Sequence, residues 1–180
     1  HIPGVDEIVL VVIDDGSDDQ TVAVARAHGV THFVSHPQRR GLAQSFQDGV
    51  LYCLSQGADI IVNTDGDNQY PSEDIPRLIQ PILEGKADMV IADRQVHKIV
   101  DFSPGKKLFQ KLGTWTLNKA ARTSLPDAPS GFRAYSRRLL CDVPYVQNSD
   151  DFVFDSQMIA QANWRGYVTT EVPIPTRYFP

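Results

Sequence analysis

The clearest chemical signal in the sequence is a pair of carboxylates, Asp65 and Asp67, on either side of Gly66 in the stretch IIVNTDGDNQYPSED. They follow an apolar run, and side chains two positions apart in an extended segment point to the same side. Like charges placed in this way repel each other unless a cation lies between them. Because carboxylate oxygens suit Mg²⁺ and Mn²⁺, the pair predicts a metal site with coordination positions left open for a phosphate.

Other interpretations of the acidic segments are plainer. A calcium loop of the EF-hand type needs Gly at its sixth position and Glu at its twelfth, where this chain has Tyr70 and Pro76. That excludes an EF-hand and leaves a merely solvated acidic loop as the alternative. A second acidic cluster, DDGSDD at residues 14–19, follows the apolar run VVI and has its own alternative as a turn and helix start.

Apolar runs alternate with helical patterns along the first half of the chain. Strand, helix and strand repeated in this way predict an α/β fold with a mainly parallel sheet flanked by helices. In such sheets ligands bind beyond the carboxyl ends of the strands, which is where both acidic clusters lie. Gly29, Gly57 and Gly85 each stand where a left-handed helix end is expected. The expected strands cover residues 7–13, 31–36, 58–64 and 87–93, and the expected helices cover residues 19–29, 41–57 and 72–85.

The composition of the 180 residues is that of one globular domain. A net charge of −5 argues against a nucleic-acid partner, because phosphate contacts call for a basic excess. No segment reaches the roughly 20 apolar residues of a membrane span. Cys53 and Cys141 are far apart, and we expect free, buried thiols in a reducing compartment. The start at HIPGVDE, without Met, indicates a single domain over residues 1–180 that is truncated at its N-terminus, with truncation at the C-terminus left open.

Residues 104–122 are a basic helix candidate with five basic residues and no acid. Leu108, Leu112 and Trp115 have helical spacing, which is typical of an amphipathic helix on a membrane surface. An ordinary core-facing helix with a solvated basic side is the alternative, since Gly113 weakens the helix.

A third acidic group, Asp150, Asp151 and Asp155, lies at the start of a helix candidate over residues 151–163. These residues either cap that helix or supply a base that takes the proton of a hydroxyl group. The Gly-rich phosphate loops GxGxxG and GxxxxGK[ST] are absent, which excludes the common dinucleotide-binding and P-loop classes.

Five motifs in this order, VVIDDGSDDQT, RRGLAQSFQDG, NTDGDNQYPSEDIP, DAPSGFRAYSRR and EVPI, resemble the inverting GT-A glycosyltransferases of family 2. The closest resemblance is to the dolichol- or polyprenyl-phosphate mannosyl- and glucosyltransferase branch, and it covers nearly the whole chain. It implies the GT-A fold, Mg²⁺ or Mn²⁺ as cofactor, and a GDP- or UDP-hexose donor. The family normally begins with a strand ending in a PxYNE-like motif that cradles the nucleotide, and nothing before EIVLVVI corresponds to it. Many members of the branch also carry membrane helices after the catalytic domain.

The resemblance also implies roles for individual residues. The nucleotide base or ribose is expected to contact the end of the first motif, at Val12, Asp14 and the neighbouring Asp15. The metal and the nucleotide diphosphate are expected to be held by Asp65, Gly66, Asp67 and Gln69, with Asp65, Asp67 and Gln69 as metal ligands. The basic positions of the branch correspond to Arg94, Arg133 and either Lys106 or Lys107.

The chemistry of the residues agrees with this resemblance. Breaking the bond between a sugar and a nucleotide diphosphate places negative charge on the leaving diphosphate, which a cation held by Asp65 and Asp67 stabilises. A phosphate acceptor is already ionised near neutral pH, so it needs a positioning cation, for which we select Arg133, rather than a base. The alternative for Arg133 is a surface residue paired with a carboxylate such as Asp127.

We therefore expect a metal-dependent enzyme that transfers a hexose to a polyprenyl phosphate, in the cytoplasm at the inner face of a membrane. The alternative enzyme transfers the sugar to a carbohydrate hydroxyl, with Asp151 as the base. The alternative outside catalysis is a module that only binds a nucleotide sugar.

Overall fold

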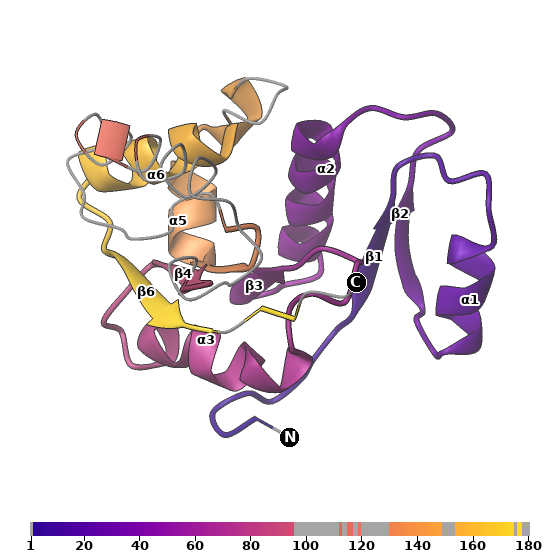
Figure 1. Ribbon diagram of the computed structural model, residues 1–180, viewed down its shortest axis with the longest axis horizontal. Coiled ribbons are helices and arrows are strands. Elements are labelled where there is room, and N and C mark those ends of the chain that lie inside the picture. The colour runs from indigo at the N-terminus through magenta and orange to yellow at the C-terminus, as the bar shows by residue number, and fades with distance from the viewer. Residues whose placement is uncertain are drawn as a thin grey trace.

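The computed structural model describes residues 2–95, 112, 115, 116, 119, 130–148, 154–174, 176 and 177 of the chain. Strands and helices alternate within them, and the expected α/β class is confirmed (Figure 1). In chain order the elements are β1 (Val11–Asp14), α1 (Thr21–Ala27), β2 (His32–Ser35), α2 (Leu42–Ser55), β3 (Ile60–Asn63), η1 (Ser72–Asp74), α3 (Ile75–Leu83), β4 (Met89–Asp93), β5 (Arg133–Ser136), α5 (Arg137–Asp142), η3 (Tyr145–Gln147), α6 (Phe154–Trp164) and β6 (Thr169–Pro173).

The described strands form two sheets. One consists of β1 and β2, which run parallel, and the other has the strand order β3-β5-β4-β6. β4 and β6 are parallel, as the sequence pattern predicts, whereas β5 is antiparallel to both β3 and β4. The insertion of β5 between β3 and β4 places Arg133 directly beside Asn63, at the end of β3 that precedes the carboxylate pair.

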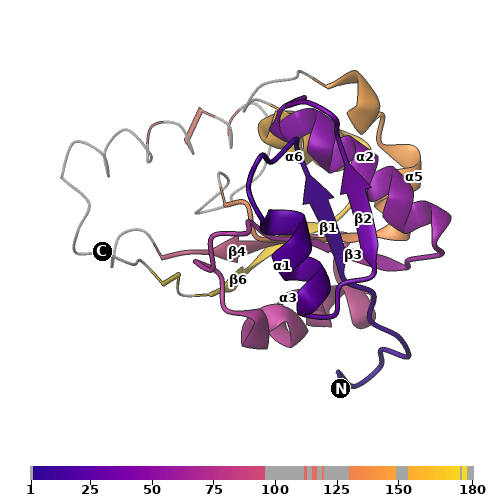
Figure 2. The ribbon, with the colours of Figure 1, turned by 90° about the vertical axis from the view of Figure 1, so that its right-hand side faces the viewer.

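The first strand is shorter than the one expected over residues 7–13. Its pairing with β2 begins only at Val11 (Figure 2). The three preceding residues, Ile8, Val9 and Leu10, are 64%, 44% and 64% exposed. The apolar run also led us to expect a buried strand along residues 7–13, and that prediction is wrong, because an apolar run is buried only where a neighbouring strand or helix covers it.

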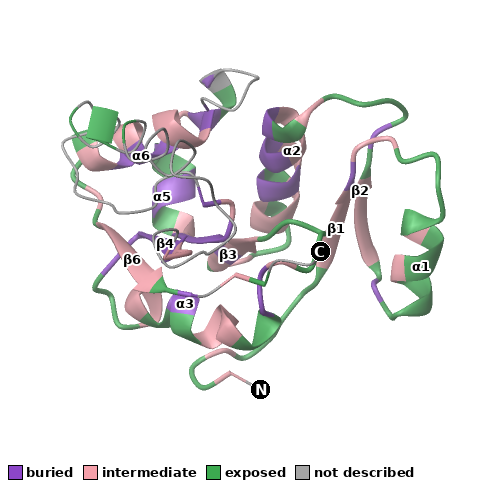
Figure 3. Ribbon diagram, viewed as in Figure 1, coloured by how far each residue is buried: buried purple, intermediate pink, exposed green. Residues whose placement is uncertain are grey.

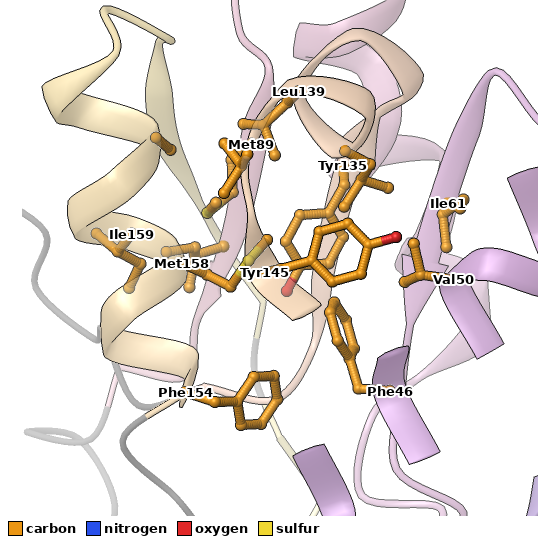
Figure 4. Close-up of a cluster of buried hydrophobic side chains, with 14 of the residues drawn as sticks. Phe46, Val50, Ile61, Met89, Tyr135, Leu139, Tyr145, Phe154, Met158 and Ile159 are labelled. Carbon is orange, nitrogen blue, oxygen red and sulfur yellow. The ribbon is translucent and has the colours of Figure 1, made fainter. Parts of the chain in front are cut away.

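The four-stranded sheet carries helices on both faces. Figure 1 shows α3 below this sheet and α2, α5 and α6 above it. Along β4 the side chains alternate between the two faces, so that Met89 and Ile91 join the core under α2, α5 and α6, while Val90 and Ala92 join the core over α3. The larger of these cores is drawn in Figure 4, and its aromatic members are Phe46, Tyr135, Tyr145 and Phe154.

The ends of the first three helices follow the sequence prediction. Gly29, Gly57 and Gly85 have φ angles of 90°, 87° and 66°, the left-handed conformation that ends a helix at little cost only for glycine. Burial differs between these helices: α1 has no buried residue, whereas α2 turns a buried side toward the core (Figure 3).

Both cysteines are free thiols, as expected, but neither is buried. Cys53 on α2 is partly exposed, and Cys141 on α5 is exposed. A helix that covers a sheet turns one side toward solvent. The sequence spacing did not predict that Cys53 and Cys141 would reach that solvent side.

The basic segment 104–122 lies largely outside the described residues. Its described members are helical, and they are Leu112, Trp115, Thr116 and Lys119. Among the helices within the described ranges, none has both the length and the apolar character needed to cross a membrane.

Candidate functional site

The carboxylate pair lies in a turn that leaves the end of β3. Asp65 and Asp67 are exposed, and the backbone N–H of Gln69 donates to Asp67 Oδ1 over 3.0 Å. Asn68 has a φ of 60°, a left-handed conformation that asparagine adopts more readily than most residues, and it turns the chain at this point. The turn borders a cavity of about 260 Å³ that is lined by Thr64, Asp65, Gly66, Asn68, Tyr70, Ser72, Ile75 and Phe132.

Asp65 lies among several charges. Although Asp65 as a whole residue is exposed, protein atoms around its carboxyl group partly shield that group from water, and this raises its pKa most. The negative charges of Asp67 and Asp155 raise this pKa further. The positive charges of Arg94 and Arg133 lower it. Asp65 is therefore influenced by two further carboxylates, one in its own turn and one on α6, and by two guanidinium groups, one on β5 and one directly after β4. This is the setting expected of a site for a cation and an anionic ligand.

Arg133 lies in the interior, with 0% of its surface exposed. Its Nε donates to the carbonyl oxygen of Ser130 over 2.7 Å, and its Nη1 donates to Asp155 Oδ1 over 2.8 Å. The alternative of a surface arginine is therefore wrong, and Asp127, the partner suggested for it, lies outside the described residues. Burial raises the pKa of Tyr135 to about 12, and the charge of the neighbouring Arg133 guanidinium opposes that rise.

Asp155 is the second residue of α6, in the first turn of the helix, and it pairs with Arg133. Its side chain remains 25% exposed, so one carboxylate group faces the buried guanidinium and still reaches solvent. Burial raises the pKa of Asp155, and the charge of Arg133 opposes that rise. Sequence reasoning missed this pairing, because an acid in the first turn of a helix is explained equally well by the helix dipole. Asp151, our candidate base, lies outside the described residues, as does Lys107.

Asp15 joins the loop after β1 to the start of α2 through hydrogen bonds. Its two oxygens accept the backbone N–H groups of Arg40 and Gly41 over 2.8 and 2.9 Å. Its Oδ1 also lies 2.7 Å from Nδ1 of the buried His36, whose Nε2 lies 3.0 Å from Asp48 Oδ2 on α2. Burial alone raises the pKa of Asp15, but the hydrogen bonds from His36, Arg40 and Gly41 lower it to about 2. The sequence held no signal for this role of His36.

The remaining expected site residues lie on β1 or in segments that follow β3 and β4. Val12 and Asp14 are on β1, and Asp14 is buried, with its Oδ1 accepting the backbone N–H of Ser17 over 3.1 Å. Arg94 directly follows β4, and Gln69 follows the carboxylate turn. The structure thus brings the expected metal ligands together with the two described arginines, while the described contacts of Asp14 and Asp15 are with β2, α2 and their own loop.

The carboxylate pair fits a divalent cation. Both side chains are exposed, and a Cβ atom added to Gly66 would meet no atom within 4 Å, so the turn is open to a ligand. Mg²⁺ typically uses one or two carboxylates together with substrate phosphates and water. Within the described ranges, no group of three or more His, Cys, Asp or Glu side chains is arranged to hold an ion.

The sequence is similar to those of two transferases whose names specify a lipid phosphate. It is 31% identical over 172 residues to the dolichyl-phosphate hexose transferase of Haloferax volcanii, in an alignment that covers 93% of this chain and 69% of the relative. It is 28% identical over 178 residues to the undecaprenyl-phosphate mannosyltransferase of Micrococcus luteus, covering 94% of this chain and 72% of the relative.

A solved structure shares the fold. It is glucosyl-3-phosphoglycerate synthase from Mycobacterium tuberculosis in complex with Mn²⁺, UDP and phosphoglyceric acid, with a TM-score of 0.71 and 22% identity. The match covers 96% of this chain and 61% of the synthase chain. The sequence model of glycosyl transferase family 2 matches residues 5–143 of this chain. The likeness to the synthase shows the GT-A fold. Because the family match spans most of this chain, the chain belongs to glycosyltransferase family 2.

Proposed function

We propose that this family 2 glycosyltransferase moves a hexose from a nucleotide-sugar donor to a polyprenyl phosphate, with Mg²⁺ or Mn²⁺ held at Asp65 and Asp67. The observation that carries the proposal is the exposed carboxylate pair after β3, where the positive charges of Arg94 and Arg133 act on Asp65. The names of the Haloferax and Micrococcus relatives support a lipid-phosphate acceptor. The Mn²⁺ and UDP in the Mycobacterium synthase structure support a divalent metal and a nucleotide donor.

The residues of the turn have different roles in binding the donor. The cation, when bound, neutralises the charge that develops on the leaving diphosphate. Asp65 and Asp67 hold it, with Gln69 as a further oxygen ligand, and the open backbone at Gly66 leaves room for the diphosphate. Beside them Tyr70 and Phe132 stack with their ring centroids 5.0 Å apart, and both line the cavity, so they close one side of it with apolar surface. Val12 and Asp14 contact the nucleoside in this proposal.

The acceptor phosphate requires positive charge and no general base. The proposal keeps Arg133 as the cation for this phosphate. Because the guanidinium is fully buried against Asp155, this role requires Asp155 to release it when the acceptor binds. Arg94 adds a second positive charge whose influence reaches Asp65 and Tyr70.

Two exposed apolar side chains support a membrane location. Leu112 and Trp115 are 57% and 59% exposed, and Lys119 Nζ lies 5.4 Å from the centroid of the Trp115 ring. An exposed tryptophan beside a lysine suits the interface between lipid headgroups and acyl chains. We place the enzyme at the cytoplasmic face of a membrane, where a polyprenyl phosphate is accessible.

Asp155 favours one alternative acceptor, a carbohydrate hydroxyl. A hydroxyl acceptor needs a base, and a carboxylate whose pKa burial raises, still partly exposed and close to Asp65, has the properties of one. In this alternative Arg133 only holds Asp155 in place.

Transfer assays with Asp155→Asn separate the two acceptors. Labelled UDP- and GDP-hexoses are offered with polyprenyl phosphate and, separately, with sugar alcohols, and the thermal unfolding of the variant is measured alongside. The proposal predicts transfer to polyprenyl phosphate that changes by less than about tenfold in Asp155→Asn, because no base is needed. Transfer only to a hydroxyl, lost by about a hundredfold or more in a folded Asp155→Asn, supports the alternative instead.

A further inference from the structure

Gly131, one residue before Phe132 in the motif SGFR, lies against the carboxylate of Asp65. A Cβ atom placed on Gly131 would lie 2.8 Å from Asp65 Oδ2 and 3.4 Å from both Asp65 Cγ and Asp65 Oδ1. These are the three nearest atoms to that position. The space that a side chain of residue 131 would occupy is therefore taken up by Asp65.

The backbone conformation does not explain the glycine. Gly131 is not among the residues with a positive φ, so an alanine could adopt its backbone angles without strain. Other glycines of the chain, such as Gly29 and Gly57, have positive φ and open space around them. At Gly131 the situation is reversed, and the requirement for glycine comes from the neighbouring carboxylate.

Gly131 is held in place on both sides. Its backbone N–H donates to the Tyr70 hydroxyl oxygen over 3.3 Å, and its carbonyl oxygen accepts from Asn63 Nδ2 over 3.0 Å. Asn63 is the last residue of β3 and stands opposite Arg133 of β5. A side chain at residue 131 could move away from Asp65 only if these two hydrogen bonds broke, so Asp65 is the group that must give way.

We propose that Gly131 is a positioning residue that sets where the Asp65 carboxylate lies and thereby how tightly the site binds its cation. This inference rests on the proposed metal site at Asp65 and Asp67. A side chain at residue 131 pushes one of the two carboxylates out of the position in which both can share an ion. Groups that hold a ligand in place without touching the metal typically change its affinity by about 10- to 100-fold when they are altered.

The experiment measures the affinity for Mn²⁺ alone, by electron paramagnetic resonance of the free ion, together with thermal unfolding without metal. The variants are Gly131→Ala, Asp65→Ala and the double variant. Gly131→Ala should weaken Mn²⁺ binding by at least about tenfold. In the Asp65→Ala background, Gly131→Ala should cause no further loss of affinity and a smaller fall in the melting temperature, because the group that it displaces is gone.

Gly49→Ala is the matched control. A Cβ atom there would lie equally close, 2.8 Å, to Ile13 Cδ1, but in the apolar contact between α2 and β1. Gly49→Ala should lower the melting temperature and leave Mn²⁺ affinity within about twofold of the wild type, since a flexible Ile side chain is the only group disturbed.

Three results would overturn the inference in different ways. If Asp65→Ala lowers Mn²⁺ affinity but folded Gly131→Ala binds Mn²⁺ as the wild type does, the metal site stands and Gly131 does not position it. If Asp65→Ala itself binds Mn²⁺ like the wild type, the proposed metal site fails and the role of Gly131 fails with it. If Gly131→Ala does not fold, the inference is tested by thermal unfolding of the double variant with Asp65→Ala. A double variant that also fails to fold contradicts the inference.

Discussion

Asp155 and Arg133 form an ion pair whose two members differ in exposure, since Arg133 is fully buried and Asp155 is partly exposed. The pair could not be predicted from the sequence, because the two residues are 22 positions apart and belong to different elements. Asp65 and Asp67 could be proposed as a metal site from the sequence, because that proposal needs only a spacing of two residues within one turn. Local spacing was thus enough to predict a metal site at Asp65 and Asp67, whereas the charges around these residues depend on tertiary contacts.

Removing Asp155 should destabilise the protein strongly. Asp155→Ala leaves a buried guanidinium without its carboxylate, which typically costs about 3–5 kcal/mol of unfolding free energy. The double variant Arg133→Met/Asp155→Leu should recover most of that loss, because it removes both charges. Urea unfolding followed by circular dichroism measures both effects.

The control is Asp142→Ala, which removes a pair with Arg165 whose side chains are 51% and 43% exposed. Exposed pairs contribute about 0–1 kcal/mol, so this variant should be close to the wild type. An Asp155→Ala variant as stable as Asp142→Ala would mean that Arg133 does not depend on its partner.

Among the elements, the alternation of strands and helices and the glycine-ended helices followed from local pattern. The position of β5 did not, because an antiparallel strand from the second half of the chain enters between β3 and β4, and no local periodicity specifies that pairing. The extent of β1 also depends on a partner, since its ladder starts only where β2 begins. Non-local pairing therefore decides both the sheet order and the surroundings of Asp65.

The loop after β1 should have a distinctive acid response. The pKa of Asp15 is lowered from 3.8 to about 2 in the folded protein, so its carboxylate stabilises the fold above pH 3.8 and loses that contribution as the pH falls through about 2. Asp15→Asn should be less stable than the wild type at pH 7, and the difference should shrink between pH 4 and pH 2. Urea unfolding at a series of pH values measures it. A stability difference that does not change over this range would mean that Asp15 is not held by its described partners.

For the whole molecule, a net charge of −5 opposes general binding to anionic lipids, so attachment to a membrane must depend on a local surface. Leu112, Trp115 and Lys119 provide such a surface among the described residues. This membrane role was an expectation from residues 104–122, and it stays a prediction.

Trp115→Ala should weaken binding to vesicles of phosphatidylcholine and phosphatidylglycerol by about tenfold, the effect of losing one partly inserted aromatic side chain. Trp164→Ala is the matched control, because Trp164 on α6 is 65% exposed and lies outside the basic segment. Co-sedimentation with the vesicles measures both. An equal loss in the two variants, or no binding by the wild type, would argue against this surface as the membrane contact.

In the proposed enzyme, Asp65 and Asp67 hold the cation that binds the donor diphosphate. Isothermal titration calorimetry of UDP and GDP, with and without Mn²⁺, can compare the wild type with Asp67→Ala. We expect Mn²⁺ to strengthen binding of at least one nucleotide to the wild type and to have no such effect on Asp67→Ala, while the two proteins have similar melting temperatures. Equal Mn²⁺-dependent affinity in both proteins would mean that the metal binds elsewhere.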